Sequence, residues 1–373
     1  MQYSSLRLPL AWATVAAVTF APAIVPTSMP ILYAGLLFAW LLAITFWAAF
    51  GVVHEAEELA DILGEPYGTL ILTLSIVIIE VALISAVMLG PKALPTLGRD
   101  TMFAVLMIVL NGVVGLGLLV GGLRHHQQSF NLQGASAYLA VTIPLAVIAL
   151  VLPNFTTSTV PGTFSTGQAI LFSLLTIALY GIFLWLQTGR HKGFFQPIQP
   201  TQNVEEVDAS PLPHSAVSDG AAPVSRTRHV ILLLANILPI VILSKSLARL
   251  LDAGIEALAA PTALGGIIVA MIVFTPEGIS SLRAVAANQL TRAINLCLGA
   301  ATSTLGLTVP AVLLIGLFTG QPVVLGLSAA NMALLAMTLV LNGITFSGSR
   351  TTMFEGAVHL SLFAVFLILV FMP

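Results

Sequence analysis

The sequence predicts an all-α integral membrane protein with about eleven transmembrane helices: one extra N-terminal helix followed by two inverted five-helix repeats. Three observations carry this prediction. The 373 residues are 58% apolar and only 8% charged, with a mean hydropathy of +1.03. Apolar runs recur along the chain, and one polar segment divides them into two groups. Because a soluble domain usually carries about a quarter charged residues, a fully water-exposed surface is excluded.

The composition also narrows the classes of function. The single cysteine, Cys297, lies in an apolar stretch, so the chain has no disulfide of its own and no cysteine metal cluster. We interpret it as a small packing residue. A net charge of −2 gives no broad basic face, so no nucleic-acid partner is expected. No Gly-rich phosphate-binding loop occurs, which argues against ATP-driven transport by this chain.

Eleven apolar runs are the candidate spans. A helix needs about 20 mainly apolar residues to cross the hydrocarbon core. The first run is long and no small-residue cleavage site follows it, so we interpret it as a helix rather than a signal peptide. The runs lie at 8–26, 30–53, 68–90, 101–122, 137–153, 167–188, 229–247, 262–282, 293–318, 323–345 and 355–372.

The basic residues orient these helices. With the N-terminus inside, nine of the thirteen Lys and Arg residues fall on the cytoplasmic side, and the others, which fall outside, are Lys92, Arg99, Lys245 and Arg249. Cytoplasmic loops carry an excess of basic residues. The distribution therefore favours a cytoplasmic N-terminus and an outward C-terminus.

Residues 190–228 interrupt the apolar pattern. They are rich in Pro, Ser, Ala and acids, and they predict a flexible cytoplasmic linker. The predicted units are an extra helix within 1–29, a first five-helix repeat over 30–189, the linker, and a second repeat over 229–373. Because five is odd, the repeats would enter the membrane in opposite directions, which is the inverted-repeat layout of many secondary transporters.

Two carboxylates lie inside predicted spans. An ionisable group there costs roughly 2.5–3.5 kcal/mol on insertion scales. Glu80 and Glu277 each belong to the second span of a five-span half, so an approximate two-fold axis in the membrane plane would bring them together near its middle. For either residue alone, a protonated side chain bonded to a neighbouring helix is the structural alternative. The matched pair favours a cation site.

Residues close to the glutamates could complete such a site. Pro276 cannot donate a backbone hydrogen bond, which frees a carbonyl one turn earlier, and Gly278 loosens the same turn. An interrupted helix beside a carboxylate would supply the hard oxygen ligands that metal cations prefer. Hydroxyls could be added by Thr73, Ser75 and Thr275, although hydroxyls also pack helices in membranes.

The next span of each half repeats a weaker pattern. Asn111 lies twelve residues after Arg99, and Ser303 lies eleven residues after Arg292. Asn111 is the stronger ligand candidate, because an amide within lipid needs a partner. Ser303 could equally be a packing residue.

Electrostatics predicts how two such carboxyls would work. Burial in a low dielectric raises the pKa of a carboxyl, whereas a bound cation lowers it, so protons and cations compete for the same groups. If the empty, doubly ionised site cannot cross between inward and outward states, cation movement one way requires proton movement the other way. Competition at one shared site is therefore sufficient for exchange.

The two glutamate regions also carry a family resemblance. GEPYGTLILTLSIVIIEVALI and TPEGISSLRAVAANQLTRAINL resemble the two alpha-repeats of the calcium/cation:proton antiporter superfamily, most closely its bacterial ChaA-type members. The resemblance covers essentially the whole chain and implies exchange of sodium, potassium or calcium for protons in the bacterial inner membrane. It assigns binding of cation and proton to Glu80 and Glu277, and places further polar positions near Asn111 and Ser303.

One departure bears on the choice of ion. Many calcium exchangers of this superfamily carry Gly-Asn just before each repeat glutamate, but here Ile76-Val77 and Val273-Phe274 occupy those positions. Two amide ligands are therefore missing, whereas Ca²⁺ takes six to eight oxygens. Sodium and potassium become real competitors for the site.

An acidic cluster follows the second span, comprising His54, Glu55, Glu57, Glu58 and Asp61. Its simplest interpretation is a solvated amphipathic helix at the membrane interface. The functional interpretation is a cation funnel or pH sensor, because dense negative charge concentrates cations and histidine titrates near neutrality.

Two other classes of function, a cation channel or uniporter and an intramembrane enzyme, fit the sequence less well than exchange. A cation channel or uniporter would need polar residues along several helices, and these spans show only isolated ones. An intramembrane enzyme would need a nucleophile or metal motif such as His-Glu-x-x-His, which is absent. We therefore expect no enzyme activity and no cofactor, only transported Ca²⁺, Na⁺ or K⁺ and protons as partners beside membrane lipid. The oligomeric state is left open.

Overall fold

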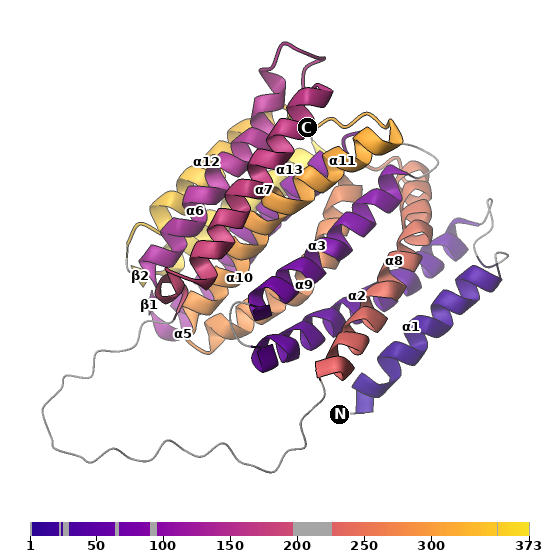
Figure 1. The fold of residues 1–373 in the computed structure, drawn as a ribbon, viewed down its shortest axis with the longest axis horizontal. Helices are drawn as coiled ribbons and strands as arrows, with labels where there is room; N and C mark the ends of the chain where they lie inside the picture. Colours follow the sequence, from indigo (N-terminus) through magenta and orange to yellow (C-terminus); the bar gives the residue numbers. More distant parts are fainter. Residues whose placement is uncertain are drawn as a thin grey trace, which may run out of the picture.

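A bundle of long helices forms the molecule, and the computed structural model describes residues 2–21, 24, 30–63, 67–89, 95–196, 226–348 and 350–372 (Figure 1). Most of the predicted linker, residues 197–225, and Lys92 lie outside this description. Within the described ranges, eight helical stretches are long and apolar enough to cross a membrane. Three shorter apolar helices accompany them, Leu6–Phe20, Thr73–Met88 and Ala329–Thr345. Every predicted span therefore corresponds to a helix, and the predicted fold class is confirmed.

The first half of the chain contains six of these helices. The elements in order are α1 (Gln2–Phe20), α2 (Ile31–Leu63), α3 (Tyr67–Met88), α4 (Leu97–Met107) continued by η2 (Ile108–Val113) and α5 (Val114–His125), α6 (Leu132–Ala146) continued by η3 (Val147–Val151) and η4 (Leu152–Asn154), and α7 (Thr166–Thr188). A short 3-10 turn, η5 (Lys192–Phe195), follows α7.

Five further helices form the second half. They are α8 (Arg226–Ala257), α9 (Ala263–Ala286), α10 (Leu290–Ser303) continued by η6 (Thr304–Thr308) and α11 (Val309–Thr319), α12 (Ala329–Thr345) and α13 (Met353–Phe371). A two-residue antiparallel pairing joins β1 (Gln128–Ser129) to β2 (Arg350–Thr351). When the extra α1 is set aside, the third helix of each half changes from α to π geometry partway along, at η2 and at η6.

The structure differs from the prediction at both ends of the linker. Residues 190–196 are ordered around η5, and α8 already begins at Arg226. Aromatic packing explains the first difference, because Phe195 meets the rings of Tyr138 and Phe183. The Pro, Ser and acidic composition of the whole segment does not indicate that its first seven residues are ordered.

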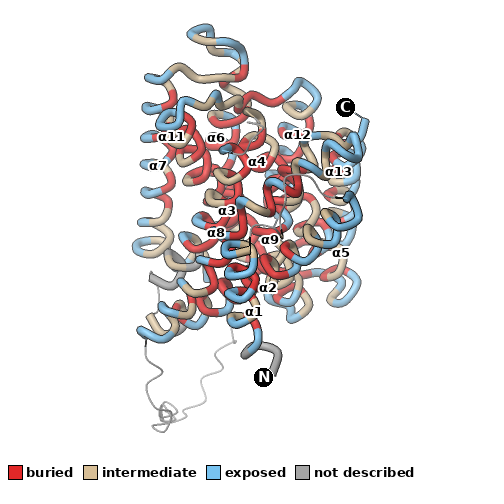
Figure 2. The backbone as a smooth tube through the Cα atoms, turned by 90° about the vertical axis from the view of Figure 1, so that its right-hand side faces the viewer, coloured by how far each residue is buried: buried red, intermediate tan, exposed pale blue. Residues whose placement is uncertain are grey.

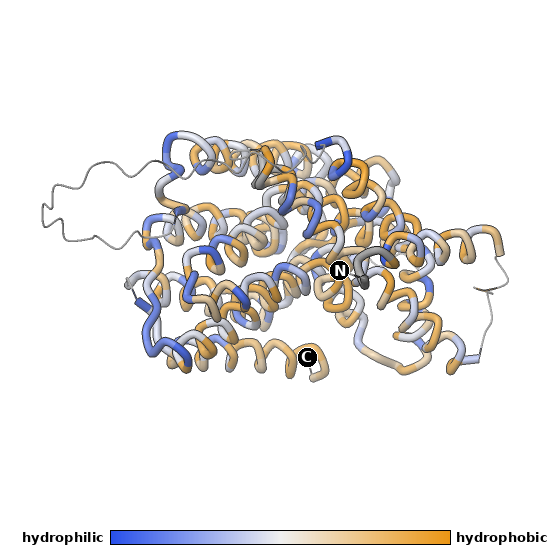
Figure 3. Tube along the Cα trace, turned by 90° about the horizontal axis from the view of Figure 1, so that it is seen from below, coloured by the Kyte–Doolittle hydropathy of each residue, from blue (hydrophilic) through white to orange (hydrophobic). Residues whose placement is uncertain are grey.

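Burial separates central from peripheral helices. The continuous helices Leu97–His125 and Leu290–Thr319 are each 67% buried over their most apolar window, against 28% for α7 and for α13. Figure 2 shows buried residues along the central α3, α4 and α9, and exposed ones along α7 and α13. In Figure 3 most of each helix is hydrophobic, and hydrophilic segments lie mainly at the turns. The exposed apolar faces of the outer helices suit lipid contact.

Helix ends and crossings follow local chemistry. Capping boxes start α7, where Ser165 pairs with Gln168, and α13, where Thr352 pairs with Glu355. At the crossing of α13 with α5, a Cβ on Gly356 would lie only 2.5 Å from the Leu119 backbone nitrogen. Only glycine permits that close approach, which is the usual role of small residues between membrane helices.

Contacts at the helix ends join residues that the predicted threading places on the same side of the membrane. At one end Arg7 contacts Glu55, and Arg292 contacts Glu57. At the other end the Arg99 guanidinium donates to the Gly326 carbonyl at 3.0 Å. The start of α1 and the end of α13 lie at opposite ends of the bundle (Figures 1 and 2). A chain that crosses a membrane an odd number of times has its two ends on opposite sides.

Candidate functional site

Glu80 lies on α3 with its side chain fully buried. Its Oε2 accepts hydrogen bonds from the Thr304 hydroxyl at 3.1 Å and the Thr308 hydroxyl at 2.8 Å. Its other oxygen, Oε1, is buried and has no hydrogen-bond partner among the described side chains and backbone. One half of the carboxyl is therefore anchored, and the other half is free to bind a proton or a cation.

The two threonines come from the π segment η6 of the second half. A π turn is wider than an α turn, occurs mostly as a short interruption and is frequent at functional sites. Here it directs both hydroxyls towards a carboxylate on a helix of the first half. Sequence reasoning missed Thr304 and Thr308, although the run TSTLGLT inside an apolar span was a visible signal.

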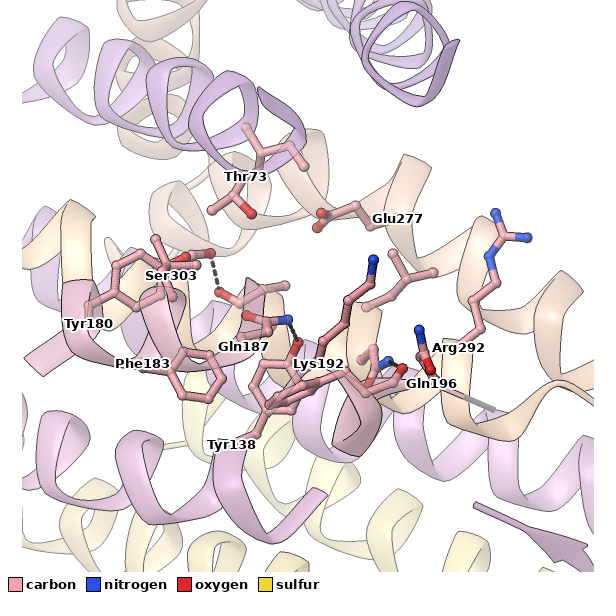
Figure 4. A pocket seen from close by; sticks show the side chains of 17 residues that line it. Thr73, Tyr138, Tyr180, Phe183, Gln187, Lys192, Gln196, Glu277, Arg292 and Ser303 are labelled. Atoms are coloured by element: carbon pink, nitrogen blue, oxygen red, sulfur yellow. Dashed lines mark hydrogen bonds between the residues drawn. The ribbon is translucent and has the colours of Figure 1, made fainter. Parts of the chain in front are cut away.

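Glu277 lies on α9 and is 9% exposed, with no hydrogen-bond partner for its buried Oε2 in the part of the chain that the structure describes. It lines a cavity of about 370 Å³ (Figure 4). Thr73 and Ser303, both predicted site residues, line the same cavity. The structure thus joins residues of both halves around one carboxylate.

The two glutamates lie close enough to interact electrostatically. The packing of the halves explains this proximity. The Glu80 helix, α3, packs against η6 of the second half, and the Glu277 helix, α9, packs against η2 of the first half. α3 and α9 also contact each other. The crossed contacts place both carboxyls in the interior, as the matched sequence positions predicted.

The hydroxyls nominated from the sequence separate into two groups. Thr73 lines the cavity and lies within hydrogen-bonding reach of the Tyr180 hydroxyl. Ser75 and Thr275 instead donate to carbonyls of their own helices, Ile71 at 2.7 Å and Met271 at 2.6 Å. Neither of these two lines the cavity of Glu277.

Pro276 and Gly278 do not interrupt α9. The helix continues from Ala263 to Ala286 with Pro276 inside it. Proline removes one backbone donor, so the Ile272 carbonyl lacks its usual partner one turn earlier. A Cβ on Gly278 would lie 3.3 Å from Val113, which indicates tight packing between α9 and the other half. The expected helix break is therefore wrong, and the irregular backbone lies in the π segments instead.

Asn111 lies in η2 but does not line the cavity of Glu277. Its amide nitrogen donates to the Thr338 hydroxyl at 2.8 Å, and its oxygen lies 3.1 Å from Nδ1 of His359. Nε2 of His359 in turn lies 3.0 Å from the Thr345 hydroxyl. The partner that a buried amide requires is thus supplied by α12 and α13 rather than by a glutamate. No spacing in the chain links His359 to Asn111, which lie 248 residues apart.

The acidic cluster is not one solvated face. Glu55 is buried, 3.6 Å from the Arg7 guanidinium and 2.8 Å from Nδ1 of His229. His54 and Glu58 are exposed, Glu57 is half-buried, and the Asp61 side chain lies outside the description. The expectation of a solvated helix is therefore wrong for Glu55, because α1 and α8 cover it and supply its countercharge.

The mouth of the Glu277 cavity is formed by residues that were not expected at a site. Lys192 and Gln196 come from the start of the linker, and Arg292 comes from the start of α10. Deeper in the cavity the Gln187 amide donates to the Tyr138 hydroxyl at 2.7 Å. Figure 4 shows Lys192 extending into the cavity towards Glu277.

Carboxylates are sparse around this site. In the described ranges no three His, Cys, Asp or Glu side chains are arranged to hold a metal ion together. Beside Glu80 and Glu277, the oxygens that the described residues bring to this site are neutral ones such as the Thr73 and Thr304 hydroxyls.

Comparison with known proteins gives a consistent picture. The profile of the family described as "Sodium/calcium exchanger protein" matches residues 33–189 and 228–372. The putative ionic transporter y4hA of Sinorhizobium fredii is 40% identical over 369 residues, which cover 98% of this chain and 95% of that relative. The sodium-potassium/proton antiporter ChaA of Escherichia coli is 40% identical over 326 residues, 87% of this chain and 86% of the relative.

The fold has a solved counterpart. The structure of native YfkE aligns with a TM-score of 0.72 at 17% identity, covering 99% of this chain and 98% of that one. At this level of identity the likeness concerns the fold alone.

Proposed function

The chain belongs to the sodium/calcium exchanger protein family, and from this membership we propose that it is a membrane antiporter that exchanges a metal cation for protons. One relative that is 40% identical carries the name sodium-potassium/proton antiporter, which supports coupling to protons. In this proposal Glu80 and Glu277 bind the cation and the protons in competition.

One observation carries the proposal: two buried carboxylates lie near each other, and each has a buried oxygen without a hydrogen-bond partner among the described residues. A buried carboxylate without a countercharge is costly, so the pair favours a state in which protons or a cation neutralise it. Exchange follows if only the neutralised pair can pass between inward-facing and outward-facing states.

The cavity supports alternating access. It reaches Glu277 from the end of the bundle where the linker begins, through Lys192, Gln196 and Arg292. We propose that this end is cytoplasmic and that the structure is inward-facing. A second arrangement of the halves would then open the pair to the other side.

The choice of cation rests on opposing effects. Two carboxylates balance a divalent ion best, but the neutral oxygens that would complete a calcium shell are few. Val77 and Phe274, at the positions of the missing amides, are both buried and apolar. We therefore propose broad selectivity in which Ca²⁺ and Na⁺, and K⁺ by the same reasoning, all drive proton movement.

The test is exchange by purified protein in vesicles that hold an internal pH dye and are challenged in turn with Na⁺, K⁺ and Ca²⁺. Glu80→Gln and Glu277→Gln should each abolish cation-driven proton flux, because the amide keeps the volume but cannot titrate. Glu256→Gln, which changes an exposed carboxylate on α8, is the matched control and should transport normally. Normal exchange in either site variant contradicts the shared site, and cation flux without proton flux indicates a channel or uniporter.

A further inference from the structure

The start of the linker holds a lysine at the entrance to the cation cavity. η5 follows the end of α7, and Lys192 is its first residue. Lys192 lines the cavity, and in Figure 4 its side chain runs across the cavity towards Glu277. A positive charge in the path of a cation is not required by the proposed exchange, so its position calls for a separate explanation.

The backbone beneath this lysine is firmly held. The Asn131 amide donates to the carbonyls of Gly193 at 3.1 Å and Gln196 at 3.3 Å. The Asn295 amide donates to the Phe195 carbonyl at 2.7 Å. Because the Phe195 ring also packs on Tyr138 and Phe183, the lysine is anchored to α6, α7 and α10 rather than left on a free linker.

The two basic side chains at the entrance, Arg292 and Lys192, differ in their carboxylate partners. Arg292 lies 3.9 Å from a Glu57 oxygen, so its charge is partly balanced there. Lys192 forms no ion pair with any carboxylate that the structure describes. Lys192 points towards Glu277, the carboxylate that a transported cation would also approach.

We propose that Lys192 sets the charge selectivity of the site by disfavouring divalent cations relative to monovalent ones. This proposal rests on the exchange function proposed above. The repulsion between a fixed charge and an ion is proportional to the charge of the ion, so Ca²⁺ is penalised twice as strongly as Na⁺. For an assumed charge separation of about 8 Å in water, this difference would correspond to about a two- to threefold change in relative affinity, and to more where the cavity excludes water.

The experiment compares half-saturating concentrations of Ca²⁺ and Na⁺ for proton exchange in vesicles. Lys192→Gln removes the charge, and Lys192→Arg keeps it. Arg190→Gln removes a charge from an exposed residue of the same segment that does not line the cavity. We expect Lys192→Gln to lower the half-saturating concentration of Ca²⁺ about two- to fivefold more than that of Na⁺. Lys192→Arg and Arg190→Gln should keep the wild-type ratio.

Ionic strength supplies a second readout. The effect of Lys192→Gln should shrink when choline chloride is raised from about 10 mM to about 150 mM, because the Debye length falls from about 30 Å to about 8 Å. If wild type exchanges Na⁺ alone, Lys192→Gln should gain Ca²⁺ exchange. Equal changes for both ions, an unchanged ratio, the same shift in Arg190→Gln, or a wild type that takes Ca²⁺ alone would overturn the inference. A wild type without any cation-driven proton flux would instead refute the exchange function itself.

Discussion

At the scale of single residues, the two glutamates occupy matched positions but have different surroundings. Glu80 accepts hydrogen bonds from Thr304 and Thr308. Glu277 faces a cavity and has a buried oxygen without a partner in the described ranges. Hydrogen bonds donated to a carboxylate favour its ionised form. The pair therefore combines one carboxylate that accepts hydrogen bonds from the protein with one that faces the cavity.

We expect Thr308→Val to weaken cation binding at Glu80. The valine keeps the shape but removes a donor to the carboxylate, which favours the protonated form. Protons then compete better, so half-maximal exchange requires a higher pH and roughly tenfold more cation, the equivalent of about 1.5 kcal/mol for a hydrogen bond to a charged group. Proton flux in vesicles, titrated against cation at several pH values, measures both shifts.

Thr302→Val is the control for this substitution. Thr302 is also buried, but its hydroxyl bonds Thr142 and the Leu298 carbonyl, not a glutamate. Its replacement should leave the pH dependence unchanged. Identical pH profiles for Thr308→Val and wild type would show that the hydroxyl does not influence the carboxylate.

At the scale of elements, π segments and buried charges join helices that are distant in sequence. η6 presents hydroxyls to α3, and η2 presents Asn111 to α12 and α13. Glu55 on α2 contacts Arg7 on α1 and His229 on α8. The extra N-terminal helix is thereby tied to the first helix of each repeat by charge as well as by packing.

Loss of the Glu55 carboxylate should loosen this three-helix junction. Glu55→Ala leaves the guanidinium of Arg7 buried without its countercharge, and removing one partner of a buried pair costs about 3–5 kcal/mol. Thermal unfolding of the detergent-purified protein should shift to a clearly lower temperature. Glu58→Ala changes an exposed carboxylate three residues after Glu55, and it should stay within about 0.5 kcal/mol of wild type. Equal unfolding temperatures for the two variants would contradict a structural role for the junction.

At the scale of the whole molecule, the two halves build one site because each covers the other. α3 lies against η6, and α9 lies against η2. Neither half alone contains both carboxylates, and the cavity is lined by residues of both. The site therefore requires the assembled pair of repeats, and relative movement of the halves would change access to both glutamates together.

The pH dependence of exchange is a property of this whole arrangement. If protons and cations compete for the pair, as proposed above, raising the pH removes the competitor. The half-saturating cation concentration should fall as pH rises, by up to about tenfold per pH unit for each proton displaced. The fall should end at the pH where both carboxyls are already ionised before a cation binds. Vesicle experiments at fixed membrane potential and stepped pH would measure this slope. A cation affinity that is independent of pH would refute competition at a shared site.

The sequence by itself determined the class of protein and the positions of its helices. Long apolar runs can satisfy their backbone in lipid only as helices, so every span was visible in the chain. Because an ionisable group inside a span is energetically costly, Glu80 and Glu277 could be recognised as candidate site residues from the sequence alone.

Only the tertiary structure decided which side chains meet these two carboxylates and the other buried polar groups. Thr304 and Thr308 reach Glu80 through a π turn that α periodicity does not reveal. Asn111 is satisfied by His359, and Glu55 by Arg7 and His229, across more than 40 residues of chain in each case. Lys192 enters the cavity from a segment whose composition indicates a linker. Hydroxyls, amides and single charges are short-range partners, so their roles depend on packing between helices rather than on their place in the sequence.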